Sequence, residues 1–214
     1  MARLAVFGAS GRTGMEVLRH AVAAGHQVIG ICRDPAKLSG LAFDVDVRGA
    51  DVLDPASMAK VLDDADAVIS TLGPDNGRQP TEVCSQGMRT IIRQMRLVGV
   101  RRIVAVSAVP VSAPSEKTSF ERVVLHPILW RVFGGCYRDL RLMESELAAA
   151  DDLEWAVVRP PMLTNGTAGR TLRMSWDEPL RGTRKVSRRL LAQTLVDVAT
   201  AVPFRSGTLT ITQG

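Results

Sequence analysis

Short apolar runs alternate with longer amphipathic stretches along most of the 214-residue chain. Each run has the length of a strand, and the stretches that follow carry apolar residues at helical spacing. This alternation is typical of βαβ units, in which a helix joins two parallel strands. The strands predicted in this way are residues 4–7, 27–32, 44–48, 66–70, 102–106, 154–159 and 208–212.

Helical patterns fill most of the segments between these runs. Asp54 and Pro55 have the residue types of an N-cap and a first helical position, and Ser187 is suited to cap the last helix. The predicted helices are residues 13–24, 55–64, 80–98, 120–134, 137–150 and 188–200. Residues 109–119 are expected to form a loop, and residues 164–185 loops and short strands. The whole chain, 1–214, is therefore predicted to be one doubly wound α/β domain with a mainly parallel sheet and helices on both faces.

Composition narrows the class of protein. The chain has no run of eighteen apolar residues, so we expect no membrane span, and its first residues lack the pattern of a secretory signal. Its three widely spaced cysteines suit a reducing cytoplasm and suggest neither a disulfide framework nor a metal site. The net charge of +5 equals the basic excess within residues 170–189, and aromatic residues are only 4%. Nucleic-acid binding is therefore disfavoured, and a rim that attracts an anionic cofactor or substrate is preferred.

A glycine-rich turn joins the first predicted strand to the first helix. Its spacing, G-x-x-G-x-x-G, allows a tight turn and a close approach of the backbone to a pyrophosphate. The helix that follows would direct its free N–H groups at the phosphates. The predicted contacts are Gly8, Ser10, Gly11, Arg12, Thr13 and Gly14. Directly after a strand and before an amphipathic helix, this motif is a strong indication of a Rossmann-type dinucleotide site.

The end of the second predicted strand indicates which dinucleotide is bound. An acidic residue there usually accepts from the ribose hydroxyls of NAD, whereas an arginine accommodates the 2′-phosphate of NADP. This chain has Arg33, with Lys37 one turn later and Arg12 in the glycine turn as a third cation. Because a guanidinium matches a phosphate in geometry and charge, NADP(H) is preferred over NAD. The alternative is a surface pairing of Arg33 with a nearby aspartate.

Three more contacts are expected at the ends of later strands, where ligands of parallel sheets bind. Asp51 and Val52 follow the third strand and are suited to the adenine ring, although Asp51 could instead stabilise the loop. Leu72 and Gly73 follow the fourth strand, where the backbone would run beside the cofactor. After the fifth strand, Ser107 and Ala108 would lie near the nicotinamide. The Ser107 hydroxyl could donate to a substrate carbonyl or to the carboxamide of the nicotinamide, or merely cap the next segment.

Together these motifs resemble the atypical short-chain dehydrogenase/reductase group. The similarity is greatest to its biliverdin-IXβ reductase/flavin reductase branch and to the NmrA-like NAD(P)H-binding proteins. The stretches that carry it span about 160 residues, and are 8–14, 32–34, 49–52, 72–73, 106–108 and 158–161. The resemblance implies a single domain that binds NADPH and passes a hydride to a stacked flavin or linear tetrapyrrole. It also implies that Ser107 lies at the reaction site.

Two positions depart from these relatives. A histidine often follows the Pro-Pro pair in the flavin reductase branch, whereas this chain has Met162, which could form an apolar wall for a flat ring. The main dehydrogenase superfamily uses Tyr-x-x-x-Lys, in which lysine lowers the pKa of the catalytic tyrosine. Here Tyr137 is followed by Arg141, which keeps the charge without the compact geometry of lysine. Tyr137 is thus either a catalytic residue or a packed helical side chain.

The leading hypothesis is an NADPH-dependent reductase for a flavin such as FMN or a similar planar small molecule. Its substrate side would comprise about 107–119 and 160–185. One alternative is a non-catalytic NADP(H)-sensing regulator of the NmrA-like kind, which the weak catalytic constellation favours. Another is a carbonyl reductase or epimerase that depends on Tyr137. The chain is expected to be a cytoplasmic monomer or homodimer that binds neither membranes nor nucleic acid.

Overall fold

Strands that are distant in sequence form one central sheet in the computed structural model, which describes residues 1–74, 81–111, 126–166, 171–178, 180 and 185–213. Its order is β3-β2-β1-β4-β5-β6-β10-β8, parallel except for β8, which is antiparallel to β10. A separate parallel pair joins β7 to β9. The strands are β1 (Arg3–Phe7), β2 (Gln27–Cys32), β3 (Asp46–Gly49), β4 (Ala67–Ser70), β5 (Arg102–Val106), β6 (Glu154–Arg159), β7 (Met162–Thr164), β8 (Leu172–Trp176), β9 (Lys185–Ser187) and β10 (Gly207–Gln213).

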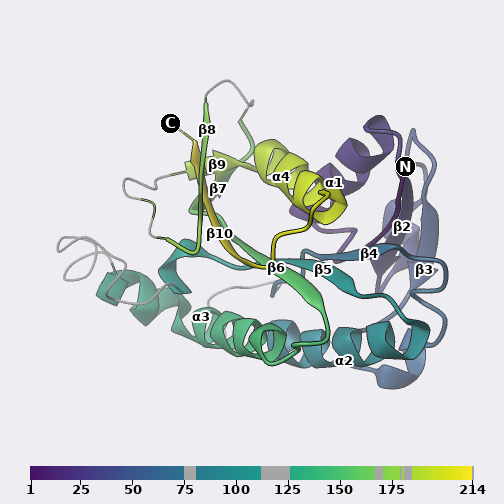
Figure 1. Cartoon of the computed structure of the whole chain (residues 1–214), viewed down its shortest axis with the longest axis horizontal. Helices are drawn as coiled ribbons and strands as arrows, with labels where there is room; N and C mark the ends of the chain where they lie inside the picture. The colour runs from purple at the N-terminus through teal and green to yellow at the C-terminus, as the bar shows by residue number, and fades with distance from the viewer. Residues whose placement is uncertain (75–80, 112–125, 167–170, 179, 181–184, 214) are drawn as a thin grey trace.

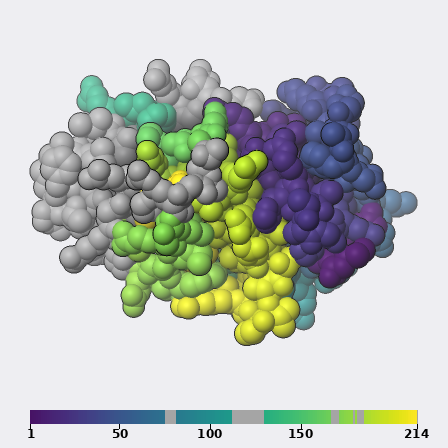
Figure 2. Space-filling view, turned by 90° about the horizontal axis from the view of Figure 1, so that it is seen from above, coloured from purple at the N-terminus to yellow at the C-terminus, as the bar shows by residue number. Residues whose placement is uncertain are grey.

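Helices cover both faces of this sheet, as predicted (Figure 1). Helices α1 (Arg12–Ala23) and α4 (Arg188–Thr200) lie side by side on one face, which Figure 2 shows from outside. Helices α2 (Val83–Val98) and α3 (His126–Ala148) pack together on the other face. Alternate residues of each central strand enter one of two apolar cores, so that Ala105 faces α2 and α3 whereas Val104 faces α1 and α4. This doubly wound, mainly parallel sheet confirms the predicted Rossmann-type fold.

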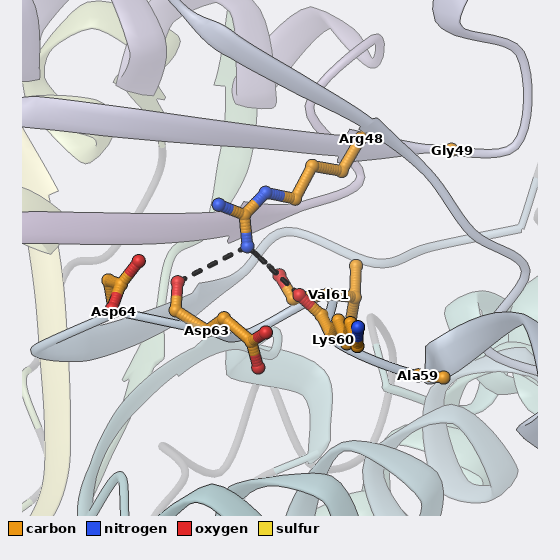
Figure 3. Close-up of a pocket in the computed structure, with 7 residues that line it drawn as sticks. All are labelled: Arg48, Gly49, Ala59, Lys60, Val61, Asp63 and Asp64. Carbon is orange, nitrogen blue, oxygen red and sulfur yellow. Dashed lines mark hydrogen bonds between the residues drawn. The ribbon is translucent and has the colours of Figure 1, made fainter.

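The predicted helix at residues 55–64 is wrong. Asp54 does cap a helix, but this is the short 3₁₀ helix η2 (Pro55–Met58), and turns follow it. Lys60 and Asp64 have φ of 60° and 64°, a left-handed conformation that a helix cannot contain. Arg48 of β3 donates from Nη1 to the backbone carbonyls of Lys60 (3.0 Å), Val61 (3.3 Å) and Asp63 (3.2 Å), and so replaces the missing helical donors (Figure 3). A hollow of about 440 Å³ beside this guanidinium therefore belongs to a structural capping arrangement.

Two further boundaries differ from the prediction. Residues 126–134 of the first predicted helix and most of the second, 137–150, belong to one helix, α3, which continues through Gly134 and Gly135. Gly134 is buried there, and a Cβ at this position would lie 3.6 Å from the Trp130 ring, an ordinary van der Waals contact. Helix α2 begins at Val83, after the predicted start. Residues 75–80 and 112–125 lie outside the described residues, as does part of 164–185. None of the helices among the described residues has both the length and the apolar character required to cross a bilayer.

Candidate nucleotide-binding and reaction site

The predicted site residues gather at one edge of the sheet, where its parallel strands end. The chain leaves β1 toward β2 and β3, and later builds β4, β5 and β6 on the other side of β1. The reversal between β1 and β4 is a topological switch point, the place where doubly wound sheets bind ligands. The segments that reach this edge are 8–14, 33–37, 50–52, 71–73, 107–108 and 160–161. The structure therefore brings all the predicted cofactor positions to one edge.

The glycine turn has the backbone that a phosphate cradle needs. Gly8 has φ of +72°, and the Gly11 N–H donates to its carbonyl oxygen at 2.9 Å. A Cβ on Gly14 would collide with the Gly8 carbonyl and with the backbone of Ala9. Helix α1 begins immediately after Gly11 without a side-chain cap, so its first N–H groups face the edge of the sheet. The turn thus fits a pyrophosphate, and a side chain at Gly14 would destroy it.

A threonine that sequence reasoning did not single out anchors this turn. Thr71 follows β4, and its Oγ1 donates to the carbonyl of Phe7 at 2.9 Å, while its own N–H donates to the same oxygen at 3.0 Å. A Cβ on Gly8 would lie 2.9 Å from the Thr71 carbonyl oxygen. Thr71 therefore joins the β1 and β4 sides of the switch point. In the sequence, the only indication of this role was that Thr71 directly precedes the predicted contacts Leu72 and Gly73.

The cations predicted to bind a 2′-phosphate are exposed around this turn. Arg33 follows β2, and Lys37 lies in the 3₁₀ helix η1 (Pro35–Leu38). Asp34 fixes that helix, since its Oδ1 accepts from the Ala36 N–H at 3.2 Å. Arg12 is the first residue of α1 and is also exposed. Three cations with solvent-accessible side chains therefore flank the turn on its β2 side and at the helix start.

The segment expected to contact adenine is held by helix α2. Gly87 of α2 allows Val52 and Leu72 to pack on it, because a Cβ there would lie 2.8 Å from Val52 Cγ2 and 3.0 Å from Leu72 Cδ1. Asp51 also has a structural role: its Oδ1 accepts from the Leu53 N–H at 2.9 Å, and its own N–H donates to Ser57 Oγ at 2.9 Å. The contacts of Asp51 in the structure are thus those of a loop-stabilising residue. Its contact with adenine stays a prediction.

Ser107 has an unusual environment at the end of β5. Its side chain is 5% exposed, and in the part of the chain that the structure describes its Oγ has no hydrogen-bond partner. Its N–H donates to the Val158 carbonyl at 2.9 Å, so the strand pairing extends to this residue. Buried hydroxyls are rarely left unpaired, because desolvation without a hydrogen bond is costly. The orphaned Oγ is therefore suited to a ligand, whereas capping of the next segment would have given it a partner.

Tyr137 lies on α3 and is half-buried among aromatic rings. Its ring centroid is 5.6 Å from that of Trp130 and 6.1 Å from that of Phe133. Burial raises the pKa of Tyr137 to about 12, with a smaller contribution from Cys136. A tyrosine that serves as general acid and base needs its pKa lowered toward the working pH, so this shift has the opposite sign.

Arg141, the residue at the position of the superfamily lysine, contacts Trp130 and the chain after β5. Its guanidinium lies 4.4 Å from the centroid of the Trp130 ring, and its Nε donates to the Val111 carbonyl at 3.3 Å. Trp130 in turn donates from Nε1 to the Pro110 carbonyl at 3.2 Å. Arg141 and Trp130 therefore hold the 3₁₀ turn η3 (Val109–Val111) that follows Ser107.

The rest of the predicted substrate side is described only in part. Met162 begins β7 and is 67% exposed, so its side chain is accessible to a ligand. Ala108 is partly buried against the core that faces α3. Residues 112–119, and several residues within 160–185, lie outside the described residues. Among those that are described, no group of three or more His, Cys, Asp or Glu side chains could hold a metal ion.

Fold and site together define a Rossmann-type nucleotide-binding protein. The chain belongs to the NAD(P)H-binding family, whose model matches residues 8–201. It is similar in structure to the oxidoreductase ylbE from Lactococcus lactis (TM-score 0.83, 18% identity, covering 99% of this chain and 91% of that one). It is also similar to ChuY, an anaerobillin reductase from Escherichia coli O157:H7 (TM-score 0.78, 22% identity, covering 99% of this chain and 97% of that one). A third similar structure is a short-chain dehydrogenase/reductase from Veillonella parvula in complex with NADP (TM-score 0.74, 15% identity, covering 99% of this chain and 94% of that one).

Proposed function

We propose that this protein is an NADPH-dependent oxidoreductase that reduces a flavin or a similar flat acceptor. The observation that carries the proposal is the buried, unpartnered Oγ of Ser107 at the end of β5, on the side of the switch point where a nicotinamide would lie. A bound nicotinamide supplies the hydride. The protein would hold the cofactor by the glycine turn, which Thr71 anchors, and Ser107 would donate to the acceptor or to the carboxamide.

Hydride transfer to a flat acceptor agrees better with Tyr137 than a tyrosine-dependent mechanism does. With its pKa raised to about 12, its phenol is a weaker acid than an ordinary tyrosine and a poorer proton donor to a substrate. A reduced flavin can take its proton from water and needs no such group. The ChuY reductase, named for an anaerobillin, supports the general class of acceptor that we propose.

Turnover of NADPH with candidate acceptors tests this proposal. The purified protein is mixed with NADPH and with FMN, riboflavin or a quinone, and the loss of nicotinamide absorbance is followed. We expect oxidation with at least one acceptor. Tight NADPH binding without oxidation by any of them would overturn the reductase proposal and favour a cofactor-sensing regulator.

The choice of NADPH is tested at Arg33. We expect Arg33→Ala to weaken NADPH binding about 10- to 100-fold, the range for loss of a charged hydrogen-bond partner, and to change NADH binding little. Both affinities are measured by fluorescence titration. The NADH titration is the internal control, and equal losses for the two cofactors would show that Arg33 does not bind the 2′-phosphate.

Ser107→Ala should separate activity from stability. We expect kcat/KM to fall about tenfold or more, since a hydrogen bond at the reaction site is lost. The free energy of unfolding should not fall, because the removed Oγ has no partner in the described structure. The matched control is Thr194→Val, which removes a buried hydroxyl that donates to the Leu190 carbonyl at 2.9 Å. It should lower stability and leave kcat unchanged; if Ser107→Ala behaves in the same way, Ser107 is a structural residue.

A further inference from the structure

A half-buried ion pair joins the sheet to α3 close to Ser107. Arg159, the last residue of β6, donates from Nε and Nη2 to the two carboxylate oxygens of Glu144, at 3.0 and 2.6 Å. The two side chains are only 14% and 15% exposed. By contrast, the pair that Arg96 of α2 forms with Asp152 is about half exposed. Arg159 and Glu144 thus form a well-shielded bidentate pair.

The strand register places Arg159 beside Ser107. Val106 is paired with Val158, and the Ser107 N–H donates to the Val158 carbonyl, so Ser107 and Arg159 are the next residues of the two strands. Side chains alternate between the faces of a sheet. Val157 belongs to the core under α2 and α3, and Arg159, two residues later on the same strand, reaches Glu144 of α3, so Arg159 stands on this face.

The shielding of this pair suggests a role beyond stability. Removing two charges from water has a large cost, and an apolar pair would often stabilise a protein as well. Arg159 is the neighbour of Ser107 in the strand register, at the edge of the sheet where the nicotinamide would bind. A cation at that place interacts differently with the two oxidation states of the cofactor and the acceptor, because hydride transfer moves charge between them.

We propose that Arg159, which is paired with Glu144, stabilises the negative charge that the acceptor gains during reduction. This inference rests on the proposed function. In the step, the C4–H bond of the nicotinamide breaks and a bond from that hydrogen to the acceptor forms. NADPH is oxidised by two electrons, the acceptor is reduced by two, and the resulting anion takes a proton from water. Arg159 is thereby a specificity-determining residue that favours acceptors able to hold an anion in their flat ring.

The two halves of the pair should have opposite effects on cofactor binding. The oxidised nicotinamide ring is positive, whereas the reduced ring is neutral, so a nearby cation disfavours NADP⁺ relative to NADPH. We expect Arg159→Gln to lower the ratio of the NADP⁺ and NADPH dissociation constants about threefold, and Glu144→Gln to raise it by a similar factor. Calorimetric titration measures both constants and requires no turnover.

Steady-state rates give the second arm of the test. Arg159→Gln should lower kcat about tenfold, Arg159→Lys should restore part of it, and Glu144→Gln should not lower it. The control is Glu154→Gln at the opposite end of the same two strands, where Glu154 accepts from Arg102 at 2.9 Å. This change should alter neither kcat nor the binding ratio.

The results that would overturn the inference are distinct from failure of the proposed function. If Arg159→Gln and Glu144→Gln shift the binding ratio in the same direction, or leave it unchanged, the pair is only a tether between β6 and α3. The same holds if the wild type turns over and both variants lose kcat equally. If the wild type binds NADPH but reduces no acceptor, the proposed function fails, whereas the binding ratio still reports whether Arg159 faces the nicotinamide.

Discussion

Gly14→Ala is expected to abolish useful NADPH binding. The new methyl group would overlap the Gly8 carbonyl and the backbone of Ala9, and backbone atoms cannot move aside as a flexible side chain can. Either the glycine turn opens or α1 shifts away from β1, and both changes displace the N–H groups that would contact the pyrophosphate. We expect the dissociation constant to rise about a hundredfold or more, in line with a misfit of about 3 kcal/mol. Fluorescence titration with NADPH measures it.

Gly134→Ala is the matched control for this prediction. Gly134 is also a buried glycine next to a helix contact, but a Cβ there would lie 3.6 Å from the Trp130 ring, an ordinary van der Waals distance. Since alanine has the higher helix propensity, this variant should be at least as stable as the wild type and should bind NADPH normally. Normal NADPH affinity in Gly14→Ala would show that the glycine turn is not the phosphate site.

The parts of the fold that local sequence determines were predictable. The strands and the glycine turn depend on the order of apolar residues and on glycine itself, so both could be predicted before the structure. The helix expected after Asp54 could not be corrected in this way. The local signals were those of a helix start, but Arg48, from a different strand, stabilises a turn instead by binding three carbonyls. A long-range contact decided the structure of that segment.

The same distinction separates the two halves of the candidate site. The predicted cofactor positions follow strand ends, so their gathering at one edge of the sheet could be predicted from the sequence. The reaction half depends on how α3 packs on the sheet. The Tyr137 and Arg141 spacing suggested a catalytic pair, yet in the fold Arg141 stacks on Trp130 and holds η3. The pairing of Arg159 with Glu144 had no signal in sequence either, since their contact exists only once α3 lies across β6.

Asp139→Ala should destabilise the whole helical layer over one face of the sheet. Asp139 of α3 is 2% exposed, and its two carboxylate oxygens accept from the Cys84 and Ser85 N–H groups, both at 2.9 Å. These donors belong to the first turn of α2, which has no side-chain cap of its own. Removing the carboxylate leaves two buried donors unpaired at the positive end of a helix dipole.

We expect this loss to cost about 3 kcal/mol of unfolding free energy, which for a chain of this size lowers Tm by roughly 10 °C. Asp139→Asn keeps one good acceptor, so its Tm should lie between those of the wild type and Asp139→Ala. Thermal denaturation measures all three proteins, with the exposed Asp197→Asn as a control that should melt like the wild type. Because Gly87 of α2 packs on Val52 and Leu72, loosening α2 should also weaken NADPH binding. A normal Tm in Asp139→Ala would mean that water can replace the carboxylate, and that α3 does not secure α2 over the cofactor site.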